Sequence, residues 1–164
     1  GLVAWTYWNL GPDLCGLPEP EATERETNLR RQERRAILQR ILAVLGHPLG
    51  THTFWPCCLP VAGPDGESRF QPHADAFWSG LAQLGSRGLV VMGSAAVKAL
   101  ELPSTLRPKQ QTRHRGHLVW VLPDVEYLLE QNDGSMLPIQ PEQPQLDGPM
   151  LSFLIRSLGL LVRH

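Results

Sequence analysis

Gly88-Leu89-Val90-Val91-Met92-Gly93-Ser94 is the stretch that decides the fold. Its apolar run from Leu89 to Met92 is typical of a central strand that is covered on both faces. The glycine that follows predicts a tight turn into a helix, which we expect from Ser94 to Leu100. Because neighbouring parallel strands need a crossover connection, usually a helix, this unit indicates an α/β fold with a parallel sheet.

The same alternation of strand and helix extends to both sides of this unit. We expect three more strands, at residues 2–8, 51–55 and 117–122. We expect further helices at residues 23–45, 72–84 and 149–161, the last of them after a polar surface loop from Asn132 to Gly148. Thr23 and Glu26 have the spacing of a capping box at the first of these helices. The sequence therefore predicts one domain over residues 1–164, with three layers (αβα) and a central, mainly parallel four-stranded sheet.

The overall composition excludes several classes of protein. Of the 164 residues 42% are hydrophobic, and no apolar run approaches the roughly 20 residues that cross a membrane, so we expect no membrane contact. The net charge of −1 does not favour tight nonspecific binding to a polyanion, so any DNA contact would need a local patch. Cys15, Cys57 and Cys58 are an odd number of cysteines with two adjacent, which favours a reducing cytoplasmic location.

Two basic segments stand out. The first predicted helix carries arginines at spacings of four between acidic residues, which is typical of a solvated helix face; they are Arg30, Arg31, Arg34 and Arg35. A second segment, before the last predicted strand, contains no acidic residue and includes Arg107, Lys109, Arg113 and Arg115. It predicts either contact with DNA or an acidic partner, or a plain exposed loop.

Two further features bear on ligands. The turn at Gly93 and Ser94 can bind an anion through free N–H groups at the start of a helix, although one glycine between a strand and a helix is commonplace. The cysteines and histidines contain no Cys-x-x-Cys or His-x-x-x-His pair. We therefore expect neither a metal nor another cofactor.

Four segments in the same order resemble the uracil-DNA glycosylase superfamily, particularly its iron–sulfur branch. In those enzymes the motifs read approximately G-E-A-P-G, N-V-V-K-C-R-P-P, L-G-x-x-A-A-x-x-L and H-P-S-x-L-L. The corresponding segments here cover residues 11–18, 52–60, 89–100 and 115–129. The resemblance covers nearly the whole chain and implies a glycosylase-like fold. Only Cys58 matches a cysteine of the iron–sulfur cluster, so the cluster is expected to be absent.

The sequence departs from these motifs at the residues that catalyse the reaction or bind the base in the enzymes. Trp8 stands where the iron–sulfur branch has the acid that orients the attacking water, and Asn9 stands where the mismatch-specific branch has its water-holding asparagine. Glu19 replaces the aromatic residue that stacks on the extruded base. Phe54 replaces the asparagine that reads the uracil edge, and Leu122 replaces the histidine that stabilises the leaving anion. The resemblance therefore implies the fold without the catalytic machinery.

The leading hypothesis is a non-enzymatic adaptor in DNA replication or repair that has a protein partner, with DNA contact possible but weak. The psi subunit of the bacterial replicative clamp loader, which looks like a degenerate glycosylase, is a precedent for this use of the fold. Two alternatives stay open. One is a divergent DNA glycosylase that uses Asn9 to position water, and the other is a nucleotide- or small-anion-binding domain that uses the turn at Gly93 and Ser94.

Overall fold

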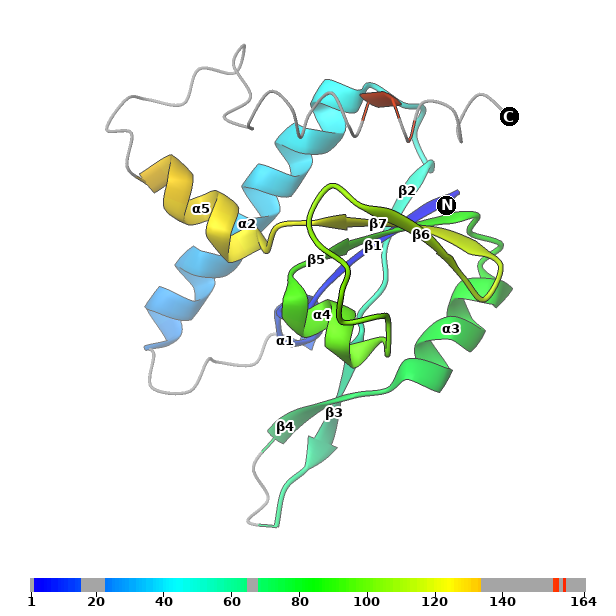
Figure 1. Cartoon of the computed structure of the whole chain (residues 1–164). Coiled ribbons are helices and arrows are strands. Elements are labelled where there is room, and N and C mark those ends of the chain that lie inside the picture. Colours follow the sequence, from blue (N-terminus) through cyan, green and yellow to red (C-terminus); the bar gives the residue numbers. More distant parts are fainter. Residues whose placement is uncertain (1, 16–22, 65–67, 134–154, 157, 159–164) are drawn as a thin grey trace.

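The computed structural model describes residues 2–15, 23–64, 68–133, 155–156 and 158 (Figure 1). The strands are β1 (Val3–Tyr7), β2 (His52–Phe54), β3 (Cys58–Ala62), β4 (Ser68–Pro72), β5 (Gly88–Met92), β6 (Gln111–His114) and β7 (His117–Leu122). The helices are α1 (Leu10–Cys15), α2 (Glu24–Leu45), α3 (Ala74–Gln83), α4 (Ser94–Ala99) and α5 (Val125–Asp133).

The central sheet is mixed and has five strands, in the order β2-β1-β5-β7-β6. β2, β1, β5 and β7 lie where the sequence predicts strands, and neighbouring members of this set pair in parallel. β6 adds a fifth strand, antiparallel to β7, which the sequence analysis did not predict. Its segment, Gln-Thr-Arg-His, is polar and half exposed because it forms the edge of the sheet. The α/β class is confirmed, and the predicted number of strands is wrong.

Helices cover both faces of this sheet, which makes three layers. In β5, Val90 and Met92 point into a core cluster that includes Ile37 and Ile41 of α2. Leu89 points to the opposite face, into a second cluster with residues of α3 and α4. Successive side chains of a strand point to opposite faces, so an apolar run without alternation is what a strand buried on both sides requires.

The predicted capping box at the start of α2 is confirmed. The backbone N–H of Glu26 donates to Oγ1 of Thr23 at 3.1 Å, and the backbone N–H of Thr23 donates to the Glu26 carboxylate at 3.4 Å. The helix ends at Gly46, whose φ of 64° lies in the left-handed region that glycine adopts without strain. Local sequence signals therefore fix both ends of this 22-residue helix.

Several segments predicted as loops form regular structure. Residues 10–15 form α1, in which Gly11 lies so close to β3 that a Cβ there would be 2.8 Å from Sγ of Cys58. The stretch at 62–71 is polar and contains Gly and Pro, yet its residues 62 and 68–71 belong to the antiparallel hairpin of β3 and β4. Pro60 is tolerated there because both strands are edges of a two-stranded sheet.

α5 was also missed. The segment 123–127 was expected as a loop, but a helix begins at Val125, and Asn132 and Asp133 belong to it rather than to the predicted loop. Val125 and Leu128 are buried in the same core cluster as α2, so tertiary packing stabilises this helix. Most of the predicted loop at 132–148 and most of the predicted helix at 149–161 lie outside the described residues.

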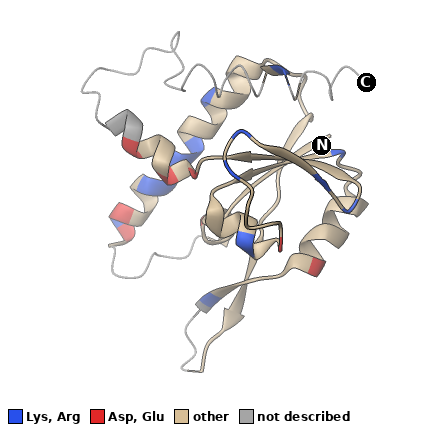
Figure 2. Ribbon diagram, viewed as in Figure 1, with Lys and Arg blue, Asp and Glu red and all other residues tan. Residues whose placement is uncertain are grey.

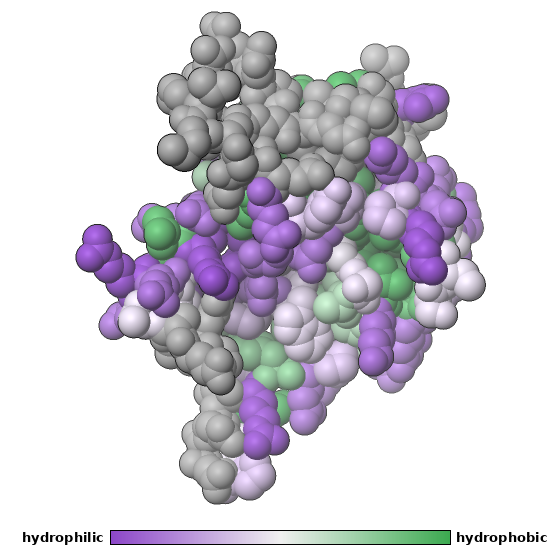
Figure 3. All heavy atoms as spheres, turned by 60° about the vertical axis from the view of Figure 1, so that its left-hand side comes forward, coloured by the Kyte–Doolittle hydropathy of each residue, from purple (hydrophilic) through white to green (hydrophobic). Residues whose placement is uncertain are grey.

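The surface on the side shown in Figure 3 is mixed. Hydrophilic side chains separate small hydrophobic areas, so the described part of this side has no extensive apolar patch. Among the helices described, none combines the length and the apolar character needed to cross a bilayer.

A chain of hydrogen bonds links the core to two histidines. Nε1 of Trp5 donates to Nδ1 of His52 at 2.9 Å. His52 must therefore carry its hydrogen on Nε2, which lies 2.9 Å from Nδ1 of His47. Burial, together with the nearby His47, lowers the pKa of His52 to about 4 from its ordinary 6.5. The structure thus requires a neutral His52.

Stability should fall in acid because of His52. The folded-state pKa lies below the ordinary value, so this contribution is intact above about pH 6.5 and is lost as the pH falls toward about 4. The expected loss is on the order of 1–2 kcal/mol, since water reaches part of the ring and screens it. His52→Asn keeps an acceptor for Trp5 without a titrating group, so urea denaturation should show a smaller acid-induced loss in this variant. The exposed His73→Asn is the control, and equal acid sensitivity of the wild type and His52→Asn would contradict the prediction.

Candidate functional site

The candidate site lies at the carboxyl ends of the parallel strands. The chain leaves β1 toward β2 on one side of the sheet and leaves β5 toward β7 on the other. Such a reversal of direction creates a crevice, which is where open α/β sheets place their ligands. Trp8 and Asn9 follow β1 at this point, and Gly93 and Ser94 follow β5.

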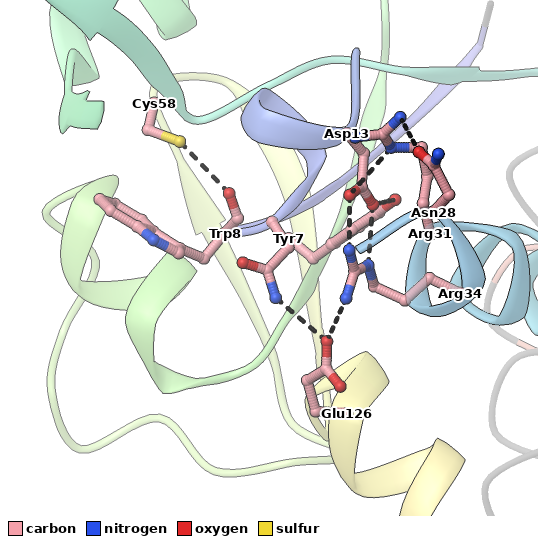
Figure 4. A network of polar contacts seen from close by, with 9 residues as sticks. Tyr7, Trp8, Asp13, Asn28, Arg31, Arg34, Cys58 and Glu126 are labelled. Atoms are coloured by element: carbon pink, nitrogen blue, oxygen red, sulfur yellow. Dashed lines mark hydrogen bonds and ion pairs between the residues drawn. The ribbon is translucent and has the colours of Figure 1, made fainter. Parts of the chain in front are cut away.

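Arg34 of α2 is the centre of a polar network at this edge (Figure 4). Its side chain is only 1% exposed. It holds the Asp13 carboxylate with two bonds, from Nε at 2.8 Å and from Nη2 at 2.6 Å. Its Nη1 donates to Oε1 of Glu126 at 2.7 Å. One guanidinium therefore joins α2 to α1 and α5, in the fork geometry that favours arginine over lysine.

Two side chains that flank the end of β1 complete the network. The Tyr7 hydroxyl donates to Asp13 at 3.3 Å, and the Asn9 amide donates to Oε1 of Glu126 at 3.1 Å. Burial and the Asp13 carboxylate raise the pKa of the Tyr7 phenol, which keeps it protonated. Burial alone would lower the pKa of Arg34, but its bonds to Asp13 and Glu126 outweigh this effect and raise it. The network therefore pairs a buried cation with two carboxylates, and Tyr7 and Asp13 also line a smaller cavity.

The positions that depart from the glycosylase motifs are not gathered around one cavity. Trp8 is half-buried and packs on the core cluster of α3 and α4, and its carbonyl accepts from the Cys58 thiol at 3.2 Å. Phe54 packs on the opposite face of the sheet, in the cluster of α2. Leu122 is completely buried in the same cluster as Phe54, that of α2. Glu19 lies outside the described residues.

The turn after β5 is occupied by a carboxylate. Gly93 has a φ of 92°, and a Cβ there would be 2.7 Å from Oδ2 of Asp124. Burial raises the pKa of Asp124, whose Oδ1 accepts the backbone N–H of Glu126 at 3.1 Å. The close approach of Asp124 explains the glycine. It also places a carboxylate beside Gly93 and Ser94.

The predicted basic segment is divided into two parts (Figure 2). Arg107 and Lys109 line a cavity beside the carboxyl end of β7. Arg113 lies on β6, opposite Leu118 near the start of β7. Arg115, in the turn that follows β6, lies 3.4 Å from the carboxylate of Asp75 and over the Trp78 ring. These residues therefore do not form one continuous patch.

The cysteines give no sign of a metal centre. Cys57 and Cys58 are buried, Cys15 is exposed, and all three thiols are free. The neighbouring Cys57 and burial raise the pKa of the Cys58 thiol, whereas the bond from Cys58 lowers the pKa of Cys57. Within the described ranges, no group of three or more His, Cys, Asp or Glu side chains could hold an ion.

Sequence reasoning missed Tyr7, Asp13, Arg34 and Glu126 as a unit. It placed Arg34 on a solvated helix face, and this is wrong because the side chain is buried. A signal was present, since Arg34 lies three and seven residues before Ile37 and Ile41, on the apolar side of α2. The distant partners Asp13 and Glu126 carried no comparable signal.

Replacing Arg34 should destabilise the fold. Arg34→Ala leaves the Asp13 carboxylate, whose side chain is 9% exposed, without its bidentate partner. The free energy of unfolding in urea should fall by about 3–5 kcal/mol. The neighbouring Arg35 is exposed, so Arg35→Ala should change the free energy of unfolding by about 0.5 kcal/mol or less. Similar losses in the two variants would show that the network contributes little.

Comparisons with known proteins give no relative for this site. No protein-family model matches the chain. No curated protein matches it significantly. The functional interpretation therefore depends on the geometry described above and on the resemblance of its segments to glycosylase motifs.

Proposed function

We propose that this chain is a non-enzymatic module with a uracil-DNA glycosylase-like fold, which acts in the cytoplasm as an adaptor in DNA replication or repair. The proposal depends on which side chains stand at the positions where glycosylases have their catalytic and base-binding residues. Trp8, Phe54 and Leu122 hold apolar side chains there, and Trp8 and Phe54 pack on opposite faces of the sheet.

Base excision makes demands that these side chains do not meet. Extruding a base costs a few kcal/mol, which stacking and hydrogen bonds to the base edge must offset. The leaving anion then needs a donor aimed at it. Leu122 and Phe54 have no polar side-chain atom, and the Trp8 indole cannot accept a proton from water.

Asn9 is the remaining candidate for a catalytic group. Its amide donates to Glu126 on the same oxygen that accepts from Arg34. This bond makes Asn9 part of the network that joins α1, α2 and α5. A structural role therefore accounts for Asn9 without a substrate.

The charge distribution favours a protein partner over extensive contact with DNA. The chain has a net charge of −1, and its densest basic segment is divided, with Arg115 already beside the carboxylate of Asp75. Tight nonspecific binding to DNA needs several cations along one surface. We infer that the main partner is a protein of the replication or repair machinery, and that any DNA contact is weak and sensitive to salt.

The proposal predicts that the protein does not excise uracil from single strands, from U·G mismatches or from U·A pairs. Loss of one donor of this kind commonly costs about 100- to 1,000-fold in rate, and several groups are replaced here. The measurement is the yield of alkali-labile abasic sites after a long incubation, with an active uracil-DNA glycosylase as the positive control. Yields should equal those of samples without protein.

Asn9→Ala is the matched variant for this assay. Excision by the natural protein that disappears in Asn9→Ala would overturn the proposal and make the chain a divergent glycosylase. We expect the natural protein and Asn9→Ala to be equally inactive. Substrates that contain hypoxanthine belong in the same series, because Asn9 could serve an unusual base.

A further inference from the structure

A cavity of about 900 Å³ lies beside the carboxyl ends of β5 and β7. Leu102, Leu106 and Tyr127 contribute apolar and aromatic surface to its wall, and Lys98, Arg107 and Lys109 contribute positive charge. Its volume falls in the upper part of the range of about 300–1,000 Å³ that small-molecule sites occupy. None of its lining residues belongs to the Arg34 network.

The charge of the cavity is unbalanced toward positive. Three of its lining residues are cations, and Asp124 is the one acid among the described lining residues. Nη1 of Arg107 donates to the backbone carbonyl of Ser104 at 3.2 Å, which is a neutral acceptor.

The cationic loop is held in place by the sheet. Lys109 has a φ of 68°, which is uncommon for a residue other than glycine. Its backbone N–H donates to the carbonyl of Val121 in β7 at 2.8 Å, and the N–H of Val121 donates back to Gln110 at 3.0 Å. Strained backbone of this kind persists where the surrounding structure imposes it, often at ligand sites.

The remaining wall includes aliphatic and aromatic side chains. Leu102 is 6% exposed and Leu106 is half-buried, so both present a firm aliphatic surface. Tyr127 is 49% exposed, and its aromatic ring forms part of the cavity wall. The cavity therefore offers aliphatic and aromatic surface together with three cations.

We propose that this cavity binds a nucleoside phosphate, with the phosphates near Lys98, Arg107 and Lys109 and the base along the wall of Leu102, Leu106 and Tyr127. Arginine and lysine are the usual partners of phosphate oxygens, and a base has a π-face that stacks on aromatic and apolar side chains. The inference goes beyond the adaptor role and does not depend on it, because no residue of the Arg34 network takes part.

Isothermal titration with ATP, tripolyphosphate and adenosine tests this assignment. ATP should bind at least about tenfold more tightly than either fragment, because it alone uses both halves of the cavity. Lys98→Gln and Lys109→Gln should each weaken the binding of ATP and of tripolyphosphate by about tenfold, since each variant removes one charge-assisted contact. Leu106→Ala should weaken the binding of ATP and adenosine but leave the affinity for tripolyphosphate unchanged.

Arg113→Gln and Arg115→Gln are the matched controls, because they remove cations of the same segment that do not line the cavity. Both should leave the affinity for ATP unchanged, and the melting temperatures of all variants should show that they are folded. Three results would each overturn the proposal: no binding of ATP at about 1 mM, equal affinities for ATP and tripolyphosphate, or equal weakening by the Arg113 and Lys109 variants. Binding of a single-stranded oligonucleotide without binding of ATP would also overturn it.

Discussion

The guanidinium of Arg34 is almost completely removed from water, and this constraint organises the carboxyl edge of the sheet. A buried charge is tolerated only when partners surround it, and here Asp13 and Glu126 supply them with three bonds of 2.6–2.8 Å. Those partners come from α1 and α5, the helices that follow β1 and β7. The charge therefore fixes where the chain goes after two parallel strands. It also fixes Asn9, whose amide shares the Glu126 oxygen.

The two halves of this edge have different characters. Around β1, polar side chains bond to one another in the Arg34 network, and Trp8 and Phe54 pack on the two core clusters. Around β7, the segment after α4 carries cations into an open cavity. A fold can lose one site and keep or acquire another, because function depends on particular groups rather than on the architecture. The proposed adaptor role and the proposed nucleoside phosphate site are compatible for this reason.

Much of the fold could be predicted because its signals are local. The run from Leu89 to Met92 indicates a buried strand by composition alone, and Thr23 with Glu26 marks the start of α2. The segments that were missed depend on distant partners. β6 is polar and becomes a strand by pairing with β7, and α1 packs against β3. The burial of Arg34 was missed in the same way, because Glu126 lies 92 residues away in the sequence.

A double-mutant cycle between Arg34 and Asp13 tests the central claim most directly. The claim is that the side chains around the end of β1 form a stabilising clamp rather than a catalytic site. The free energy of unfolding should be measured in urea for the wild type, Arg34→Ala, Asp13→Ala and the double variant. The account predicts that the double variant loses less than the sum of the two single losses, by about 1.5–3 kcal/mol. Additive losses, within about 0.5 kcal/mol, would contradict it.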